Sequence, residues 1–233
     1  MTVSAVVLAA GRGERMCAEI HKAFLELAGR PIFAYSVEAL SHVPRVKEVI
    51  VVVHPDDLAA AHSVVTSLVR RATVVTGGAT RRESSLAGIR AATGEIVLIH
   101  DGCRPFASPI LIDRIIDHTE RYGAAVPVLP SVETLYRLGG AEHRIEKVLD
   151  RASIVRAQTP QGFRRLLLLR CLEAADPGIT DDASALIAQG EPVFTLDGEV
   201  ANLKITYPED LHRAEALADR SSRRSESRRE RFA

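Results

Sequence analysis

Residues 5–22, AVVLAAGRGERMCAEIHK, decide the fold expected for this chain. The apolar and partly β-branched run from Ala5 to Leu8 predicts a buried strand of a parallel sheet. Small residues follow where that strand ends, and they let backbone N–H groups approach a ligand closely. Arg15 and Lys22 then add two positive charges. The stretch predicts a polyphosphate site at the carboxyl end of a strand, with a plain strand-to-helix turn as the alternative.

The glycine spacing excludes two common phosphate-binding loops. A dinucleotide fingerprint needs a third glycine three residues after its second, but in this chain Gly11 and Gly13 are followed by Met16. A P-loop ends in Gly-Lys-Ser/Thr, and that sequence is missing here. The loop therefore belongs to neither class.

Composition and charge exclude further classes of protein. The chain has 233 residues, of which 46% are hydrophobic, enough for one α/β domain of ordinary size or two very small ones. Its 30 basic and 30 acidic residues balance, whereas nucleic-acid-binding proteins usually carry a basic excess. The sequence has neither an apolar span of about 18 residues nor a signal-peptide pattern. We expect a cytoplasmic protein that binds neither nucleic acid nor membrane.

Strand and helix patterns alternate along the rest of the chain, which is typical of a parallel sheet flanked by helices. Lys22 to Leu27 is expected to form a helix or a short turn. The other strands are expected at 46–53, 72–75, 95–101, 124–129, 192–196 and 202–206, and helices are expected around 32–40 and 86–92 and at 56–69, 109–122, 164–175 and 208–218.

A second loop, TGGATRRESS at 76–85, follows the strand at 72–75. Thr80 and Glu83 match the capping-box pattern that starts a helix. The loop has two interpretations. It is either a capped helix start or a second ligand loop, in which backbone groups and the Ser84 hydroxyl face a nucleotide.

The strand at 95–101 ends in a carboxylate, Asp101, followed by Gly102, Cys103 and Arg104. Ligands of open α/β sheets bind at the carboxyl ends of strands. Mg²⁺ prefers one or two carboxylates together with phosphate oxygens and water. Asp101 is therefore a candidate Mg²⁺ ligand, with a helix N-cap or an ion-pair partner for Arg104 as the alternatives.

Residues 131–150 interrupt the alternation with a hairpin pattern, in which two short strands surround the segment GGAEH at 139–143. Such an arm has little core of its own and needs a partner surface, so we expect a homodimer. The sequence returns to the main fold after this arm, and 1–218 is expected to form a single domain. The Arg/Ser/Glu-rich tail at 219–233 is expected to be disordered or a solvated extension of the last helix.

The order of the motifs resembles the 2-C-methyl-D-erythritol 4-phosphate cytidylyltransferase family over about residues 3–217. The first motif alone marks the wider nucleotidyltransferase superfamily, and the later segments narrow the resemblance to enzymes that act on alditol phosphates. The motifs that carry it are LAAGRGERM, HKAFLELAGRPI, VTGGATRRESS, HDGCRPF, DRASIVRAQTPQGF, TDDAS and NLKITYPEDL.

The resemblance implies a Rossmann-like, mostly parallel twisted sheet flanked by helices, with a protruding β-hairpin arm. It also implies that CTP and a polyol phosphate give a CDP-polyol and pyrophosphate. By this resemblance, the groups that act at the reacting phosphate are Arg15, Lys22 and Lys204, and Asp101 binds Mg²⁺ or another divalent cation. The residues around CTP are Ala9, Ala10, Gly11, Gly78 and Ser84. The polyol phosphate is bound by Arg104, Thr134, Arg151 and Thr159, with the arm residues supplied across the dimer.

Alternatives to these implied roles stay open. Arg104 and Arg151 are also compatible with surface ion pairs. A ribitol phosphate or another polyol or sugar phosphate is an alternative acceptor, and a non-catalytic nucleotide-binding module is an alternative class. The chain departs from the family where His21 replaces the usual proline before the lysine, where Ala79 replaces a frequent acid, and where Gly102 and Cys103 replace common alanines.

Overall fold

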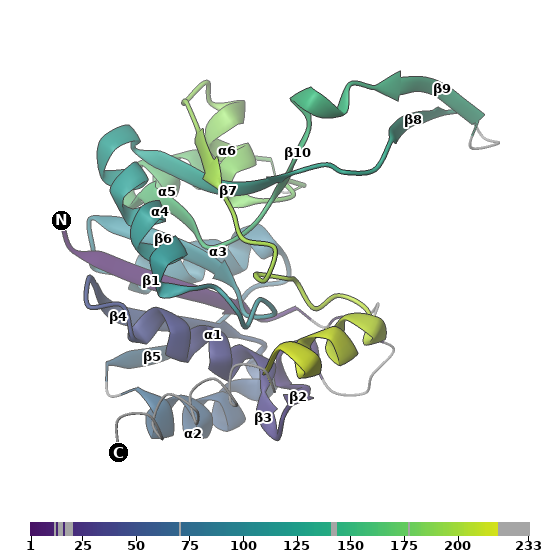
Figure 1. Cartoon of the computed structure of the whole chain (residues 1–233). Coiled ribbons are helices and arrows are strands. Elements are labelled where there is room, and N and C mark those ends of the chain that lie inside the picture. The colour runs from purple at the N-terminus through teal and green to yellow at the C-terminus, as the bar shows by residue number, and fades with distance from the viewer. Residues whose placement is uncertain are drawn as a thin grey trace, which may run out of the picture.

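The strand β1, which precedes the first glycine-containing loop, lies inside the main sheet (Figure 1). The computed structural model describes residues 1–11, 13, 16, 21–69, 71–140, 144–176 and 178–218. Within these residues the main sheet has eight strands in the order β10-β7-β11-β6-β1-β4-β5, and β12 pairs with β7. The strands are β1 (Val3–Ala9), β4 (Val46–Val53), β5 (Ala72–Thr76), β6 (Ile96–Asp101), β7 (Ala124–Pro130), β10 (Val155–Ala157), β11 (Gln161–Arg164) and β12 (Phe194–Asp197).

Helices cover both faces of this sheet because its central strands are apolar on both sides. In β1, Ala5 and Val7 pack with the helices of one face, and Val6 packs with those of the other. The first face carries α1 (Ile32–Ser41), α2 (Leu58–Leu68) and α4 (Pro109–Tyr122), and the second carries α3 (Arg81–Ala91), α5 (Arg165–Ala174) and α6 (Asp182–Ala188).

The expected fold class is confirmed, since β1, β4, β5 and β6 form a parallel block and helices flank it. Residues 208–218 form the expected closing helix. Within the described part of the chain, no helix is both long and apolar enough to cross a membrane.

The expectation of a strand at 202–206 was wrong. The segment crosses the end of the sheet and forms no ladder there. Its backbone bonds to loops and side chains and not to a strand, for example from Ile205 N to the carbonyl of Cys103 at 2.9 Å and from Thr206 N to Asp210 Oδ2 at 2.9 Å. The Ile205 side chain packs in a small separate core with Leu27, Ile32 and Ala214. The apolar pattern therefore reported burial against a helix and a turn, and not strand pairing.

Two further outcomes concern short segments. The short turn expected from Lys22 is confirmed as the 3₁₀ turn η2 (Lys22–Phe24), but the segment then continues into the strand β2 (Glu26–Leu27), which pairs with β3 (Arg30–Pro31). The segment after the arm forms β10 and β11, which sequence patterns did not indicate. β11 enters the sheet antiparallel between β6 and β7. Gly162 permits this because a Cβ there would overlap Thr119 of α4.

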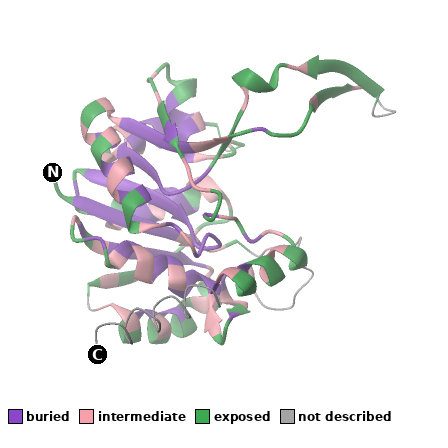
Figure 2. Cartoon of the chain, viewed as in Figure 1, coloured by how far each residue is buried: buried purple, intermediate pink, exposed green. Residues whose placement is uncertain are grey.

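The expected hairpin is confirmed and extends away from the sheet as an arm (Figure 1). It consists of β8 (Leu135–Gly139) and β9 (Arg144–Leu149), and most of it is exposed (Figure 2). The pairing places Tyr136 opposite Val148 and Leu138 opposite Ile145, all four between 50% and 60% exposed. One face of the arm is therefore apolar. The polar tail at 219–233 lies outside the described residues.

We predict that Gly88→Ala destabilises the fold, although alanine normally favours a helix. Gly88 lies in α3 against the sheet, where a Cβ would overlap Val6 and lie 2.9 Å from Val52 Cγ2. Overpacking of this kind costs about 1–3 kcal/mol, which exceeds the gain of about 1 kcal/mol in helix propensity. Urea unfolding is the measurement. Ser63→Ala on the exposed side of α2 is the control and should not lower the midpoint. A raised midpoint for Gly88→Ala would contradict the packing.

Candidate active site

Four strands end at the same edge of the sheet and bring their loops together. Leu8 in β1 pairs with Asp101 in β6, and Ala9 pairs with Val53 in β4. The loop after β6 is bound to β1, since Gly102 N donates to the Leu8 carbonyl at 2.9 Å. The loop after β5 is bound to β4, since Gly77 N donates to the Val53 carbonyl at 2.8 Å. The register of a parallel sheet thus assembles the site.

A cavity opens at this edge, and most of the sequence-predicted residues line it. The first loop and the turn after it contribute small residues and one lysine, and the second loop contributes the capped start of α3. The end of β6 contributes one carboxylate, and the segment at 202–206 contributes a second lysine. The lining residues are Leu8, Ala9, Ala10, Gly11, Lys22, Ala23, Gly78, Ala79, Thr80, Arg81, Ser84, Asp101, Cys103 and Lys204.

The second loop combines both of its interpretations. Thr80 and Glu83 form the complete capping box at the start of α3. Ser84 is buried, lines the same cavity and accepts a hydrogen bond from Gly78 N at 3.2 Å. A Cβ at Gly77 would lie only 2.7 Å from Ser84 Oγ and 2.8 Å from Ala10 Cβ. Small residues are therefore required where the two loops meet.

Asp101 is surrounded by positive charge. Its carboxylate lies 2.7 Å from Lys204 Nζ, 3.2 Å from Arg81 Nη1 and 3.9 Å from Arg104 Nε. Burial alone would raise the pKa of this carboxyl, but the attraction of Arg81 and Lys204 outweighs burial and holds the pKa well below its ordinary value. Of the two alternatives considered for Asp101, ion pairing is thus present, with Lys204 and Arg81 closer than Arg104.

Arg81 and Asp182 belong to the site but were missed by sequence reasoning. Arg81 Nη2 donates to Asp182 Oδ2 at 2.8 Å while its other amino group faces Asp101. Asp182 is 2% exposed, and burial raises its pKa against the opposing effect of Arg81. The segment TDDAS has a sufficient local explanation, since Asp181 caps α6. Only the position of Arg81 in the first turn of α3 was a signal for its role.

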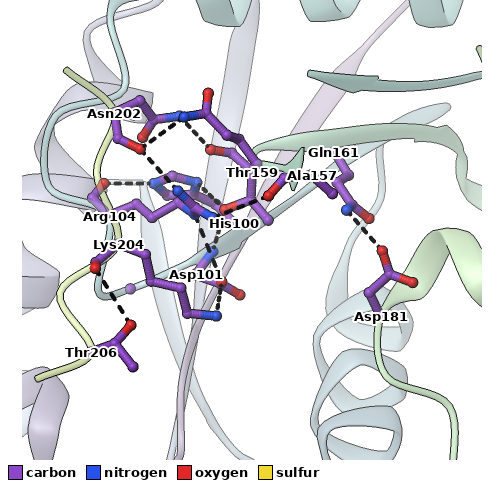
Figure 3. A network of polar contacts seen from close by, with 12 residues as sticks. His100, Asp101, Arg104, Ala157, Thr159, Gln161, Asp181, Asn202, Lys204 and Thr206 are labelled. Atoms are coloured by element: carbon purple, nitrogen blue, oxygen red, sulfur yellow. Dashed lines mark hydrogen bonds and ion pairs between the residues drawn. The ribbon is translucent and has the colours of Figure 1, made fainter. Parts of the chain in front are cut away.

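Behind Asp101, a buried polar network holds Arg104 and Thr159 in place (Figure 3). His100 is fully buried, and burial lowers its pKa to about 4, so the ring is neutral. Its Nε2 donates to the Arg104 carbonyl at 3.0 Å, which leaves Nδ1 to accept from the Thr159 hydroxyl at 3.0 Å. The same hydroxyl accepts from Asp101 N at 3.0 Å.

Arg104 is not part of a surface ion pair. It is 8% exposed, and it donates from Nη1 to the Asn202 carbonyl at 2.9 Å and from Nη2 to the Ala157 carbonyl at 3.3 Å. Asn202 Nδ2 also donates to the Thr159 carbonyl at 2.9 Å (Figure 3). Arg104 and Thr159 thus lie directly behind the cavity wall, while Asn202 connects them to the segment that carries Lys204.

Thr134 and Arg151, two of the predicted residues, are not among those that line the cavity. Thr134 is exposed at the base of the arm. Arg151 lies in the 3₁₀ turn η4 (Arg151–Ser153), where its Nη1 donates to the Val132 carbonyl at 2.9 Å. Arg15 lies outside the described residues.

The donor set bears on which metal this edge can hold. Among the described residues, no group of three or more His, Cys, Asp or Glu side chains is arranged to hold a metal ion. Of the described residues that line the cavity, Asp101 is the only one with a carboxylate. Mg²⁺ fits such a site, because it takes one or two carboxylates and completes its shell with phosphate oxygens and water.

The arrangement can bind a polyphosphate and stabilise charge on it. Lys22, Lys204 and Arg81 share one cavity with the carboxylate of Asp101, and small residues of two loops line the same space. Positioning and fixed positive charge are what phosphoryl-type transfer requires from a protein.

Comparison with known proteins gives one family. A model of 2-C-methyl-D-erythritol 4-phosphate cytidylyltransferase matches residues 3–220. The enzyme of that name from Geobacillus kaustophilus is 37% identical over 93% of this chain and 97% of its own length. A bifunctional enzyme IspD/IspF from Bradyrhizobium diazoefficiens is 44% identical over 91% of this chain, which spans only 54% of that relative.

Solved structures agree with this result. The 4-diphosphocytidyl-2C-methyl-D-erythritol synthase of Anaerococcus prevotii has a TM-score of 0.82 at 29% identity, covering 94% of this chain and 96% of that one. The 2-C-methyl-D-erythritol 4-phosphate cytidylyltransferase of Thermus thermophilus has a TM-score of 0.75 at 34% identity, covering 92% and 98%. The sequence match, the shared fold and the charged cavity at the strand ends together place this chain in the 2-C-methyl-D-erythritol 4-phosphate cytidylyltransferase family.

Proposed function

We propose that this protein transfers CMP from CTP to 2-C-methyl-D-erythritol 4-phosphate, giving 4-diphosphocytidyl-2-C-methyl-D-erythritol and pyrophosphate. The reaction belongs to the non-mevalonate route to isoprenoid precursors, and we expect it to take place in the cytoplasm. The observation that carries this proposal is that Lys22, Asp101 and Lys204, which the family resemblance singles out, line one cavity although they come from three distant segments.

The chemistry needs no general base from the protein. A phosphate monoester has its second pKa near 6, so at neutral pH the polyol phosphate is already an anionic nucleophile. Its oxygen attacks the α-phosphorus of CTP, and the bond from that phosphorus to the bridging oxygen of pyrophosphate breaks. The work left to the protein is to bring two anions together and to stabilise the charge at phosphorus.

Positive side chains do this work in the proposed mechanism. Lys22 and Lys204, which both line the cavity, would contact the reacting α-phosphate. Arg15 is proposed to act beside them. Lys204 is 40% exposed at its ion pair with Asp101, so it can contact a phosphate while remaining near that carboxylate.

Small residues of the two loops hold the nucleotide. Ala9 ends β1 and is followed by Ala10 and Gly11, and Gly78 and Ser84 belong to the second loop. Their lack of bulk leaves room for the base and ribose, and their backbone groups supply hydrogen bonds that discriminate cytosine.

Asp101 would hold Mg²⁺ together with oxygens of the triphosphate. The ion would supply additional positive charge on the phosphates. Asp101 is suited to this role because its carboxylate stays ionised and has lone pairs beyond those used by Lys204 and Arg81.

We place the polyol phosphate between Arg104 and Thr159 on one side and the arm of a second subunit on the other. Arg104 has a buried Nε without a hydrogen-bond partner, a donor still available near the cavity. Thr134 and Arg151 lie at the base of the arm and do not line their own chain's cavity. A homodimer formed through the arm would bring them to the partner's site.

The direct test is pyrophosphate release from a panel of substrates. CTP, ATP, GTP and UTP are each combined with methylerythritol phosphate and with ribitol phosphate in the presence of Mg²⁺. We expect release only with CTP and methylerythritol phosphate, the two substrates of the proposed reaction. Preference for ribitol phosphate or for another nucleotide would refute the proposed substrates.

Replacing Lys22 should abolish turnover without abolishing nucleotide binding. We predict that Lys22→Ala lowers kcat by roughly 100- to 1000-fold, because its charge acts mainly in the transition state. Calorimetry should still detect CTP binding. Lys47→Ala is the control, since Lys47 is exposed and contacts only the Pro44 carbonyl. An unchanged kcat in Lys22→Ala would exclude the assigned role.

The arm should control both assembly and activity. Leu138→Glu combined with Ile145→Glu places charge on the apolar face of the arm. We predict that sedimentation then reports a monomer and that activity is lost, since Thr134 and Arg151 no longer reach a partner site. Lys147→Glu, on the opposite face of β9, should leave the dimer intact. Full activity in a monomeric variant would contradict the shared site.

A further inference from the structure

We propose that His21 is a positioning residue, whose contact with Asp57 fixes the turn that carries Lys22. This inference rests on the proposed catalytic role of Lys22. It concerns the one position next to that lysine where the chain has a histidine in place of the proline typical of the resembled family.

The contact joins two loops at the carboxyl edge of the sheet. His21 Nδ1 lies 2.5 Å from Asp57 Oδ2, and both side chains are 19% exposed. A carboxylate only accepts, so Nδ1 of His21 donates. Asp57 belongs to the 3₁₀ turn η3 (Pro55–Asp57), which directly follows β4. β4 pairs with β1 up to Val53 and Ala9, so η3 is attached to the most central part of the fold.

Asp57 is available for this contact because it does not cap its helix. It occupies the N-cap position of α2, yet its side chain makes no capping hydrogen bond. Aspartate at this position usually accepts from the backbone of the helix it precedes. Its carboxylate accepts from His21 instead, 36 residues away in the sequence.

The contact of His21 with Asp57 restrains the position of Lys22 through the backbone of the turn. It is the N-cap residue of η2, and its carbonyl accepts from Phe24 N at 2.8 Å. The turn continues into the core, because Ala23 is buried and the Phe24 ring packs 4.9 Å from that of Phe33. Lys22 is therefore held by an anchored residue before it and a buried residue after it.

The imidazole itself stays out of the reaction. Lys22 and Ala23 line the cavity, and His21 does not. Its ring packs instead on His54, with the centroids 4.7 Å apart. His54 in turn contacts Asp56, with Nδ1 and Oδ2 3.2 Å apart. His21 and Asp57, with His54 packed on the imidazole, form a group beside the site that is suited to holding geometry and not to contacting substrate. The Asp56 side chain lies at the edge of this group and is 80% exposed.

The backbone of His21 also explains what the histidine replaces. Its φ is −58°, which lies within the range that the proline ring imposes. A proline would fix this angle covalently, whereas His21 reaches the same conformation and adds a side-chain contact. We call the contact between His21 and Asp57 the clamp. It should be needed in this chain and dispensable once a proline occupies position 21.

The experiment compares His21→Ala, Asp57→Ala and the double variant in the pyrophosphate assay. We expect each single change to lower kcat about 10-fold and to leave KM for CTP within about twofold, because misplacing a catalytic group affects the transition state. The double variant should be no worse than either single one, since both remove the same contact. His21→Pro should recover kcat relative to His21→Ala. Asp56→Ala, an exposed neighbour on the same turn, is the matched control.

A second readout does not depend on turnover. Amine labelling of Lys22, measured by mass spectrometry relative to Lys47, should rise in His21→Ala and Asp57→Ala and stay unchanged in Asp56→Ala. An active wild type and an inactive Lys22→Ala establish the proposed function separately. Given those, wild-type kcat in both clamp variants would overturn the inference. If the wild type shows no transfer, the proposed function fails, and unchanged labelling of Lys22 would then overturn the clamp on its own.

Discussion

The ion pairs of Asp101 are the interaction on which this site depends. The carboxylate is buried, and a buried charge is tolerated only when opposite charges compensate it. Lys204 and Arg81 do so at 2.7 and 3.2 Å. The three residues come from the end of β6, the start of α3 and the segment that crosses the sheet edge. One electrostatic requirement therefore joins the loops that form the cavity.

Positive charge remains in excess around this cluster. Asp182 neutralises part of Arg81, and Asp101 is shared among three cations. Lys22 lines the cavity as well. A polyphosphate that enters such a site meets several cations, while the carboxylates of Asp101 and Asp182 stay paired with positive side chains. The cavity thus combines a compensated interior with an outer layer of cations suited to anionic substrates.

Much of the fold follows from local patterns. The apolar run before Gly11 predicted β1, and Thr80 with Glu83 predicted the capped start of α3. Asp101 was recognisable because it ends an apolar strand. An apolar pattern also caused the incorrect prediction of a strand at 202–206, because burial of Ile205 in a separate core gives the same sequence pattern as a strand. Periodicity reports which residues are buried but not what covers them.

The sequence by itself determined most strands of the main sheet, the two small-residue loops and the acid at the end of β6, because each depends on neighbours within a few residues. Only the tertiary structure decided that Arg81 meets Asp182, which is 101 residues away, and that His21 meets Asp57. The sequence near each residue does not indicate these pairs, since an aspartate at the start of a helix is already accounted for by helix capping. The register of the sheet selects them, because it fixes which strand ends lie side by side.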